Sequence, residues 1–145
     1  MPFVKMYIHL IWSTKNRDKL ISKELKPLLL NHIKENSFKK EIFIDAMNCV
    51  SDHIHLLISL GAEQSISKVA MLLKGEPSFW VNKEKLSKTK FEWQDEYIAV
   101  SVSESALDKV RDYILTQEIH HQIKTFQGEY EEFIRKYEFA EKSLG

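Results

Sequence analysis

The feature that most constrains the fold of this chain is a pair of strand-like stretches that follow each other almost without interruption. Residues 41–50, EIFIDAMNCV, alternate apolar and polar side chains, and residues 52–60, DHIHLLISL, are again rich in aliphatic and β-branched side chains. Strands joined by so brief a turn pair antiparallel, because a parallel pair needs a crossover connection of about a dozen residues or more. The chain is therefore expected to build an antiparallel sheet around this pair.

The segments on either side alternate between strand and helix patterns. Gly75 and Pro77 should bend or interrupt the second helix, because proline lacks the N–H that continues the helical ladder. The order β-α-β-β-α-β-α-α predicts one domain, 1–145, of the α+β class: a ferredoxin-like antiparallel sheet with helices packed on one face. The further strands are predicted within 3–14 and 91–103, and the helices over 22–37, 62–86, 103–126 and 129–139.

Composition indicates an ordinary globular protein. Hydrophobic residues make up 43% of the chain and charged residues 29%. No apolar run approaches the ~20 residues that span a bilayer, so no membrane association and a cytoplasmic location are expected. The single cysteine, Cys49, excludes an internal disulfide framework and a cysteine-rich zinc site.

The formal net charge of zero hides an asymmetry along the chain. Residues 1–90 carry 15 Lys and Arg against 9 Asp and Glu, whereas residues 91–145 carry 6 against 12. The two halves could simply attract each other as solvated surfaces, or the basic half could hold a local patch that faces phosphate groups. Charge alone leaves both interpretations open.

Two histidines stand two residues apart on the predicted strand 52–60. The side chains of His53 and His55 therefore leave the same face, about 7 Å apart along the chain. Imidazoles at this separation can share one divalent metal ion, but buried histidines are also commonly satisfied by ordinary hydrogen bonds. His9 and His32 are assigned to packing or to the surface.

A second pattern lies in RDYILTQEIHH. Tyr113 and Gln117 are four residues apart on a predicted helix and hence stacked on one of its faces. Tyr113 could be a core aromatic, or its phenol could attack phosphorus with the help of a nearby divalent metal. Gln117 could then add an amide oxygen to the two imidazoles, and such an O/N site suits Mg²⁺ or Mn²⁺. His120 and His121 could touch the site or serve the structure.

These residues resemble a known family over nearly the whole chain, the IS200-like single-tyrosine HUH transposases of insertion sequences. The matching segments are IHLIWSTKNR at 8–17, DHIHLLISL at 52–60, KVAMLLKG at 68–75, and AVSVSES at 99–105 followed by VRDYILTQEIHH at 110–121. His-x-His alone identifies little, but joined to Tyr-x-x-x-Gln after that strand it is specific.

The resemblance implies that His53, His55 and Gln117 bind the metal, Mg²⁺ or Mn²⁺, and that Tyr113 is the catalytic nucleophile. Members of this family cut and rejoin single-stranded DNA through a 5′-phosphotyrosine and a free 3′-hydroxyl. They recognise hairpins near the ends of the element and act as homodimers. In several, the tyrosine helix of one subunit completes the histidine site of the other.

The basic half supplies candidate contacts to the DNA backbone. The aromatic side chains of Trp80, Phe79 or Trp93 could stack on unpaired bases, although core packing is expected for at least two of them. Pro77 departs from the family pattern, in which small hydroxylated residues are more usual after the Lys-Gly element. The candidate DNA-binding residues are Lys15, Arg17, Lys74, Lys83, Lys85, Lys88 and Lys90.

Two other functions remain open. A domesticated hairpin-binding protein that does not cut could use the same fold, but it would have no need for Tyr113, Gln117 and the histidine pair together. A replication-initiating nickase would use the same chemistry, but the short chain carries no helicase or partner domain.

Overall fold

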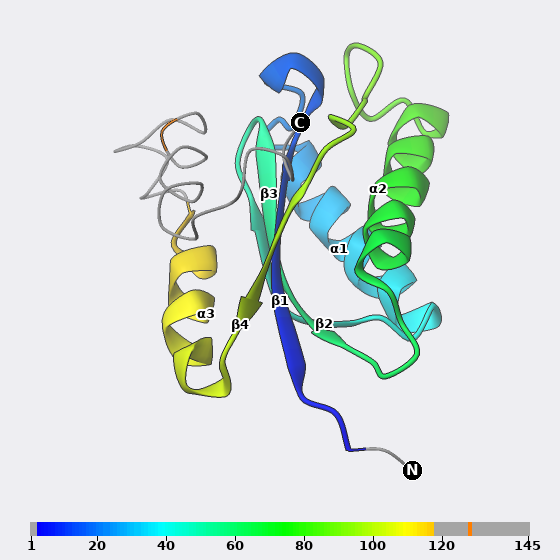
Figure 1. Cartoon of the computed structure of the whole chain (residues 1–145). Coiled ribbons are helices and arrows are strands. Elements are labelled where there is room, and N and C mark those ends of the chain that lie inside the picture. Colours follow the sequence, from blue (N-terminus) through cyan, green and yellow to red (C-terminus); the bar gives the residue numbers. More distant parts are fainter. Residues whose placement is uncertain (1–2, 118–127, 129–145) are drawn as a thin grey trace.

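The computed structural model describes residues 3–117 and residue 128. In this part of the chain, four strands form an antiparallel sheet in the order β2-β3-β1-β4 (Figure 1). The predicted α+β class and the antiparallel pairing of 41–50 with 52–60 are confirmed, whereas the helix predicted over 129–139 lies outside the described residues. The strands are β1 (Met6–Ser13), β2 (Phe43–Cys49), β3 (His53–Leu60) and β4 (Ile98–Val102), and the helices are α1 (Leu25–Lys39), α2 (Ile66–Lys83) and α3 (Leu107–Leu115).

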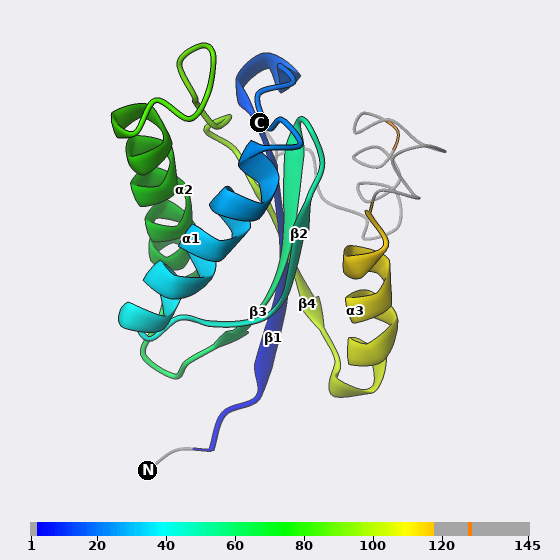
Figure 2. The same ribbon diagram turned by 180° about the vertical axis from the view of Figure 1, so that it is seen from behind.

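The helices cover both faces of the sheet. In Figures 1 and 2, α1 and α2 lie against one face, as expected, whereas α3 lies against the other. The expectation that all helices share one face therefore does not hold for α3. The cause is visible in β3, in which seven of the eight residues are buried, so that both faces of this strand need cover.

The period of two along the strands separates two apolar clusters. Ile54, Leu56 and Ile58 of β3 pack in the main core, which α1 and α2 cover. Leu57, on the opposite face, packs with Leu107 and Ile114 of α3. Odd-numbered residues of β3, which include both histidines, consequently face α3.

Helix α2 runs from Ile66 to Lys83 without interruption, with Pro77 inside it, so of the expected bend or interruption at Gly75 and Pro77, the interruption does not occur. Proline cannot donate to the carbonyl four residues earlier, that of Leu73. The helix continues because buried side chains on both sides of the proline, among them Leu73 and Val81, anchor it to the core. In the part of the chain that the structure describes, no helix is both long and apolar enough to cross a membrane.

Candidate active site

His53 and His55 lie side by side on β3 and are completely buried. Their rings stand edge to face with centroids 5.2 Å apart. On the neighbouring strand β1, Ser13 pairs with His53 and Ile11 pairs with His55. The sheet register therefore holds both imidazoles on the face that α3 covers.

Each of the two imidazoles has a hydrogen-bond partner at Nδ1. The Nδ1 atom of His53 lies 2.8 Å from Oδ1 of Asp52, the residue that precedes β3. The Nδ1 atom of His55 lies 2.9 Å from Nε2 of His9 on β1. The other ring nitrogen, Nε2, is therefore the atom that each imidazole can offer to a metal ion.

Helix α3 brings Tyr113 to the histidines. The Tyr113 ring stands edge-on to His55 and to His9, with centroid distances of 5.6 and 6.3 Å. Tyr113 is partly buried against the cluster formed by α3 and the sheet, which includes the fully buried Ile114. The phenol that the sequence singles out thus belongs to the same site as the histidine pair.

Strand β2 contacts α3 at two points, the middle of the helix and its C-terminal end. Asp45 is the extra residue of a β-bulge between Ile44 and Ala46, and both of its carboxylate oxygens accept from Arg111, at 2.6 and 2.8 Å. The Arg111 guanidinium holds the pKa of Asp45 below its usual value. At the C-terminal end of the helix, the Asn48 amide donates to the main-chain oxygens of Ile114 and Leu115, the last residues of α3.

Gln117 lies beyond α3 rather than on it. The helix ends at Leu115, and Thr116 has a non-helical backbone with φ −104° and ψ 27°. The expectation that Tyr113 and Gln117 are stacked on one regular helix face is therefore wrong. Gln117 nevertheless reaches the site: it is fully buried, and its Nε2 lies 3.3 Å from Nε2 of His53. His120 and His121 lie outside the described residues.

The donor set suits a divalent metal ion. It joins two imidazole nitrogens to an amide that carries a ligating oxygen, a mixture that Mn²⁺ accepts and that leaves coordination positions for phosphate oxygens. The amide N–H of Gln117 now points at the nitrogen of His53 that a metal would use, so metal binding calls for the amide oxygen on this side. Among residues 3–117 and 128, no three His, Cys, Asp or Glu side chains are grouped as a metal site; the third candidate donor is the amide of Gln117.

The two basic stretches of the sequence lie at one end of the sheet. The turn after β1 meets the segment that leads to β4, since the Lys15 N–H donates to the Glu92 carbonyl and Thr14 forms a β-bridge with Trp93. His53 pairs with the last residue of β1, Ser13, and therefore lies at this same end. The candidate DNA-binding side chains that are exposed in these two stretches are Lys15, Arg17, Lys83, Lys85, Lys88 and Lys90.

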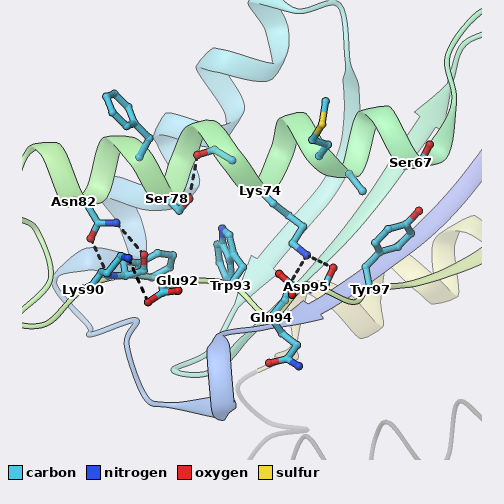
Figure 3. Close-up of a pocket in the computed structure, with 15 residues that line it drawn as sticks. Ser67, Lys74, Ser78, Asn82, Lys90, Glu92, Trp93, Gln94, Asp95 and Tyr97 are labelled. Carbon is cyan, nitrogen blue, oxygen red and sulfur yellow. Dashed lines mark hydrogen bonds and ion pairs between the residues drawn. The ribbon is translucent and has the colours of Figure 1, made fainter. Parts of the chain in front are cut away.

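A groove of about 500 Å³ runs between α2 and residues 90–97 (Figure 3). The Lys74 ammonium donates across it to the main-chain oxygens of Gln94 and Asp95, and burial lowers the pKa of this lysine. A phosphate contact would compete with these two hydrogen bonds, so Lys74 is a weaker candidate for DNA binding than the exposed lysines.

Of the three aromatic side chains considered for base stacking, two are engaged in the fold. Trp93 packs edge to face with Trp12, at 6.0 Å, and Trp80 stacks on His32 with ring centroids 3.8 Å apart. Phe79, by contrast, lines the groove with 66% of its surface exposed. The expectation that at least two of the three serve packing agrees with these contacts.

Sequence reasoning misses three residues around the site. It assigns His9 to packing or the surface and gives Asp45 and Asn48 no role, yet all three contact the residues that form or carry the site. The sequence does predict that His9 lies on one strand and that His53 and His55 lie on another. The register of β1 on β3 is what brings His9 next to His55, and the sequence does not give that register.

Comparison with known proteins identifies relatives of this chain. A curated relative, the ISDra2 transposase TnpA of Deinococcus radiodurans, is 28% identical over 115 residues, which cover 75% of this chain and 81% of that protein. A crystal structure of a candidate transposase from Deinococcus radiodurans matches with a TM-score of 0.65 and 23% identity, over 80% of this chain and 93% of the other.

A REP-associated tyrosine transposase, solved bound to a REP hairpin, matches with a TM-score of 0.63 and 15% identity, over 83% of this chain and 72% of the other. These two likenesses bear on the fold alone. The family model described as "Transposase IS200 like" matches residues 2–117, a span that contains His53, His55, Tyr113 and Gln117. The chain therefore belongs to the family of IS200-like transposases.

Proposed function

We propose that this protein cleaves and rejoins single-stranded DNA at the ends of an insertion sequence, with Tyr113 as the nucleophile and a divalent metal ion, Mg²⁺ or Mn²⁺, held by His53, His55 and Gln117. The observation that carries the proposal is the convergence of these side chains. They come from β3, from α3 and from Gln117, two residues beyond the end of α3, and they meet in one buried site. A core tyrosine or a structural histidine pair alone would not require that meeting.

The reaction that this site would perform conserves the energy of the broken bond. The Tyr113 oxygen attacks phosphorus and gives up its proton, while the P–O3′ bond breaks and the 3′-oxygen leaves and takes up a proton. The products are a 5′-phosphotyrosine and a free 3′-hydroxyl. Attack of a second 3′-hydroxyl on the phosphotyrosine rejoins the DNA and releases Tyr113.

The chain's own residues orient this reaction. Asp52 and His9 hold the two imidazoles at Nδ1, and β2 holds the helix that carries Tyr113. When bound, the metal ion would polarise the phosphate and stabilise the charge that develops on its oxygens.

The proposed substrate is a single strand that bears hairpins near the ends of the element. The structural neighbour bound to a REP hairpin supports a hairpin ligand, and the exposed lysines at the end of the sheet beside His53 support backbone contacts to the strand. Phe79, in the groove along α2, is the side chain proposed to stack on an unpaired base. The protein is proposed to act as a homodimer, as its family does.

The test is the formation of a covalent adduct. The protein is incubated with a single-stranded hairpin oligonucleotide from its own element in Mg²⁺ or Mn²⁺ and resolved on a denaturing gel. We expect a slow-migrating protein–DNA band that EDTA prevents and that Tyr113→Phe abolishes. Tyr7→Phe, a matched loss of a phenol on β1, should leave the band intact. Retention of the band in Tyr113→Phe would refute the assigned nucleophile, and tight binding without any adduct would favour a non-cutting hairpin binder.

A further inference from the structure

His9 is a third histidine in contact with the candidate site. Its ring is 3% exposed, and its Nε2 lies 2.9 Å from Nδ1 of His55. The ring centroids of the two imidazoles are 5.1 Å apart, and their planes are tilted by 37°. The contact joins the middle of β1 to the strand that carries the proposed metal ligands.

The sheet register makes this contact specific. Ile11 of β1 stands directly opposite His55, and His9 lies two residues from Ile11 on the same face of the strand. Diagonal neighbours of this kind in an antiparallel pair lie within reach of large side chains. A shift of β1 by one residue would send His9 to the opposite face.

The direction of the hydrogen bond is set by the chemistry of the site. To bind a metal ion through Nε2, His55 must carry its proton on Nδ1. Nδ1–H of His55 then donates to Nε2 of His9, so His9 must accept there and carry its own proton on Nδ1. In the same way, Nδ1–H of His53 donates to the Asp52 carboxylate. One metal-binding imidazole is thus oriented by a carboxylate and the other by a neutral imidazole.

We propose that His9 is a positioning residue: it fixes the Nδ1–H tautomer and the ring orientation of His55, so that Nε2 of His55 is presented to the divalent metal. This role rests on the proposed function, because it serves the metal that the site is proposed to hold. His9 also stands edge-on to Tyr113, with ring centroids 6.3 Å apart, so it contacts both the proposed ligand His55 and the proposed nucleophile. Partners of this kind are typically worth a factor of ~10–100 in metal affinity.

The experiment compares three full-length proteins: wild type, His9→Leu and His9→Gln. Leucine fills the space without an acceptor, whereas the glutamine amide oxygen can accept the proton in place of Nε2. The ¹⁵N chemical shifts of the His55 ring report its tautomer in the metal-free protein, and calorimetric titration with Mn²⁺ alone reports affinity. Circular dichroism and thermal melting check that each variant is folded.

We expect the wild-type His55 ring to be protonated at Nδ1, and His9→Leu to lose that preference and to bind Mn²⁺ about 10–100 times more weakly. His9→Gln should keep the tautomer and bind within a few-fold of the wild type. An Nε2-protonated His55 in the wild type, or an unchanged Mn²⁺ affinity in folded His9→Leu, would overturn the role of His9 and leave the metal site itself standing. If the wild type binds no Mn²⁺, the proposed metal chemistry and the positioning role fail together.

Discussion

His53 and His55 are completely buried, and an imidazole in an apolar interior must be satisfied by hydrogen bonds or by a metal. Both rings are anchored at Nδ1, by Asp52 and His9, and Gln117 lies against Nε2 of His53. The Gln117 side chain also carries an amide oxygen, so it brings a third potential metal donor to that nitrogen. This arrangement therefore favours a ligand role over a structural one.

Removing one proposed ligand should weaken metal binding without unfolding the protein. We expect His53→Ala to reduce Mn²⁺ affinity by at least about tenfold, because the site loses one of three protein donors and the carboxylate that orients it loses its partner. His32→Gln is the matched control, since His32 contacts Glu76 and Trp80 between α1 and α2 instead. Calorimetric titration measures the Mn²⁺ affinity of both variants. Equal affinities in His53→Ala and wild type would rule His53 out as a ligand.

For single residues, the sequence predicts the features that local geometry determines. The period of two in a strand places His53 and His55 on one face wherever that strand lies. The contact between His9 and His55 depends on how β1 is registered against β3, which no local pattern encodes. Similarly, the hydrogen bonds from Asn48 to the carbonyls of Ile114 and Leu115 join residues far apart in the sequence, and no local pattern predicts them.

At the level of helices and strands, the position of α3 decides whether Tyr113 meets the histidines. The helix is short, and its attachment to the sheet combines apolar packing through Leu107 and Ile114 with the ion pair between Arg111 and Asp45. The Asp45 side chain is 12% exposed and that of Arg111 is 38% exposed. The bidentate geometry makes this pair stronger than an ordinary surface salt bridge.

The ion pair should make the attachment of α3 depend on pH. The pKa of Asp45 is lower in the folded protein because Arg111 donates to its carboxylate, so its contribution to stability is fully present above the unfolded-state pKa and is lost as pH falls through the folded-state pKa. We expect Asp45→Asn to lower the melting temperature at neutral pH, and this difference from wild type to shrink below about pH 4. A difference that persists unchanged in acid would contradict the ion-pair explanation.

The core beneath α1 offers a matched test of packing. Leu29 is 0% exposed, whereas its neighbour Leu28 is 49% exposed. Leu29→Ala should lower the free energy of unfolding by about 2–5 kcal/mol, because it leaves a cavity in the main cluster, and Leu28→Ala should cost less than about 0.5 kcal/mol. Denaturant titration followed by circular dichroism measures both values. Similar losses for the two variants would contradict the described packing of α1.

Element by element, the sequence predicts the strands and the antiparallel hairpin well, because alternation and short connections are local signals. It fails at α2, where Pro77 suggests a break that the packing of Leu73 and Val81 overrides. It also places α3 on the wrong face. The reason appears only in the structure, where seven of the eight residues of β3 are buried, so that the face with His53 and His55 is covered as well as the apolar face.

Across the whole molecule, the folded chain gathers charges that the sequence separates. Lys15 and Arg17 follow β1, whereas Lys83 ends α2 and Lys85, Lys88 and Lys90 follow it. Because the Lys15 N–H donates to the Glu92 carbonyl, the two stretches meet at one end of the sheet. Part of this charge is balanced locally, because Lys15 and Lys90 both contact the Glu92 carboxylate. A net charge of zero is therefore compatible with a local basic surface beside the histidine site.

This surface should bind single-stranded DNA with a measurable salt dependence. If Lys88 contacts a phosphate, Lys88→Ala should reduce the slope of log K against log salt concentration by about 0.7, the contribution of one phosphate contact to a single strand. Lys109→Ala, which removes an exposed lysine from the first turns of α3, should leave the slope unchanged. Fluorescence anisotropy with a labelled hairpin oligonucleotide measures the salt-dependence slope of each variant. Equal slopes for the two variants would exclude Lys88 from the DNA contacts.

The proposed reaction leaves one residue covalently bound to DNA, and the identity of that residue is its most direct test. The adduct formed with the hairpin substrate and Mn²⁺ is digested with protease and nuclease, and the modified peptide is sequenced by mass spectrometry. We expect a 5′-linked nucleotide on Tyr113, on the peptide that also contains Ile114 and Leu115. A nucleotide on any other residue, or cleaved DNA with no covalently modified peptide, would contradict the assignment of Tyr113 as the nucleophile.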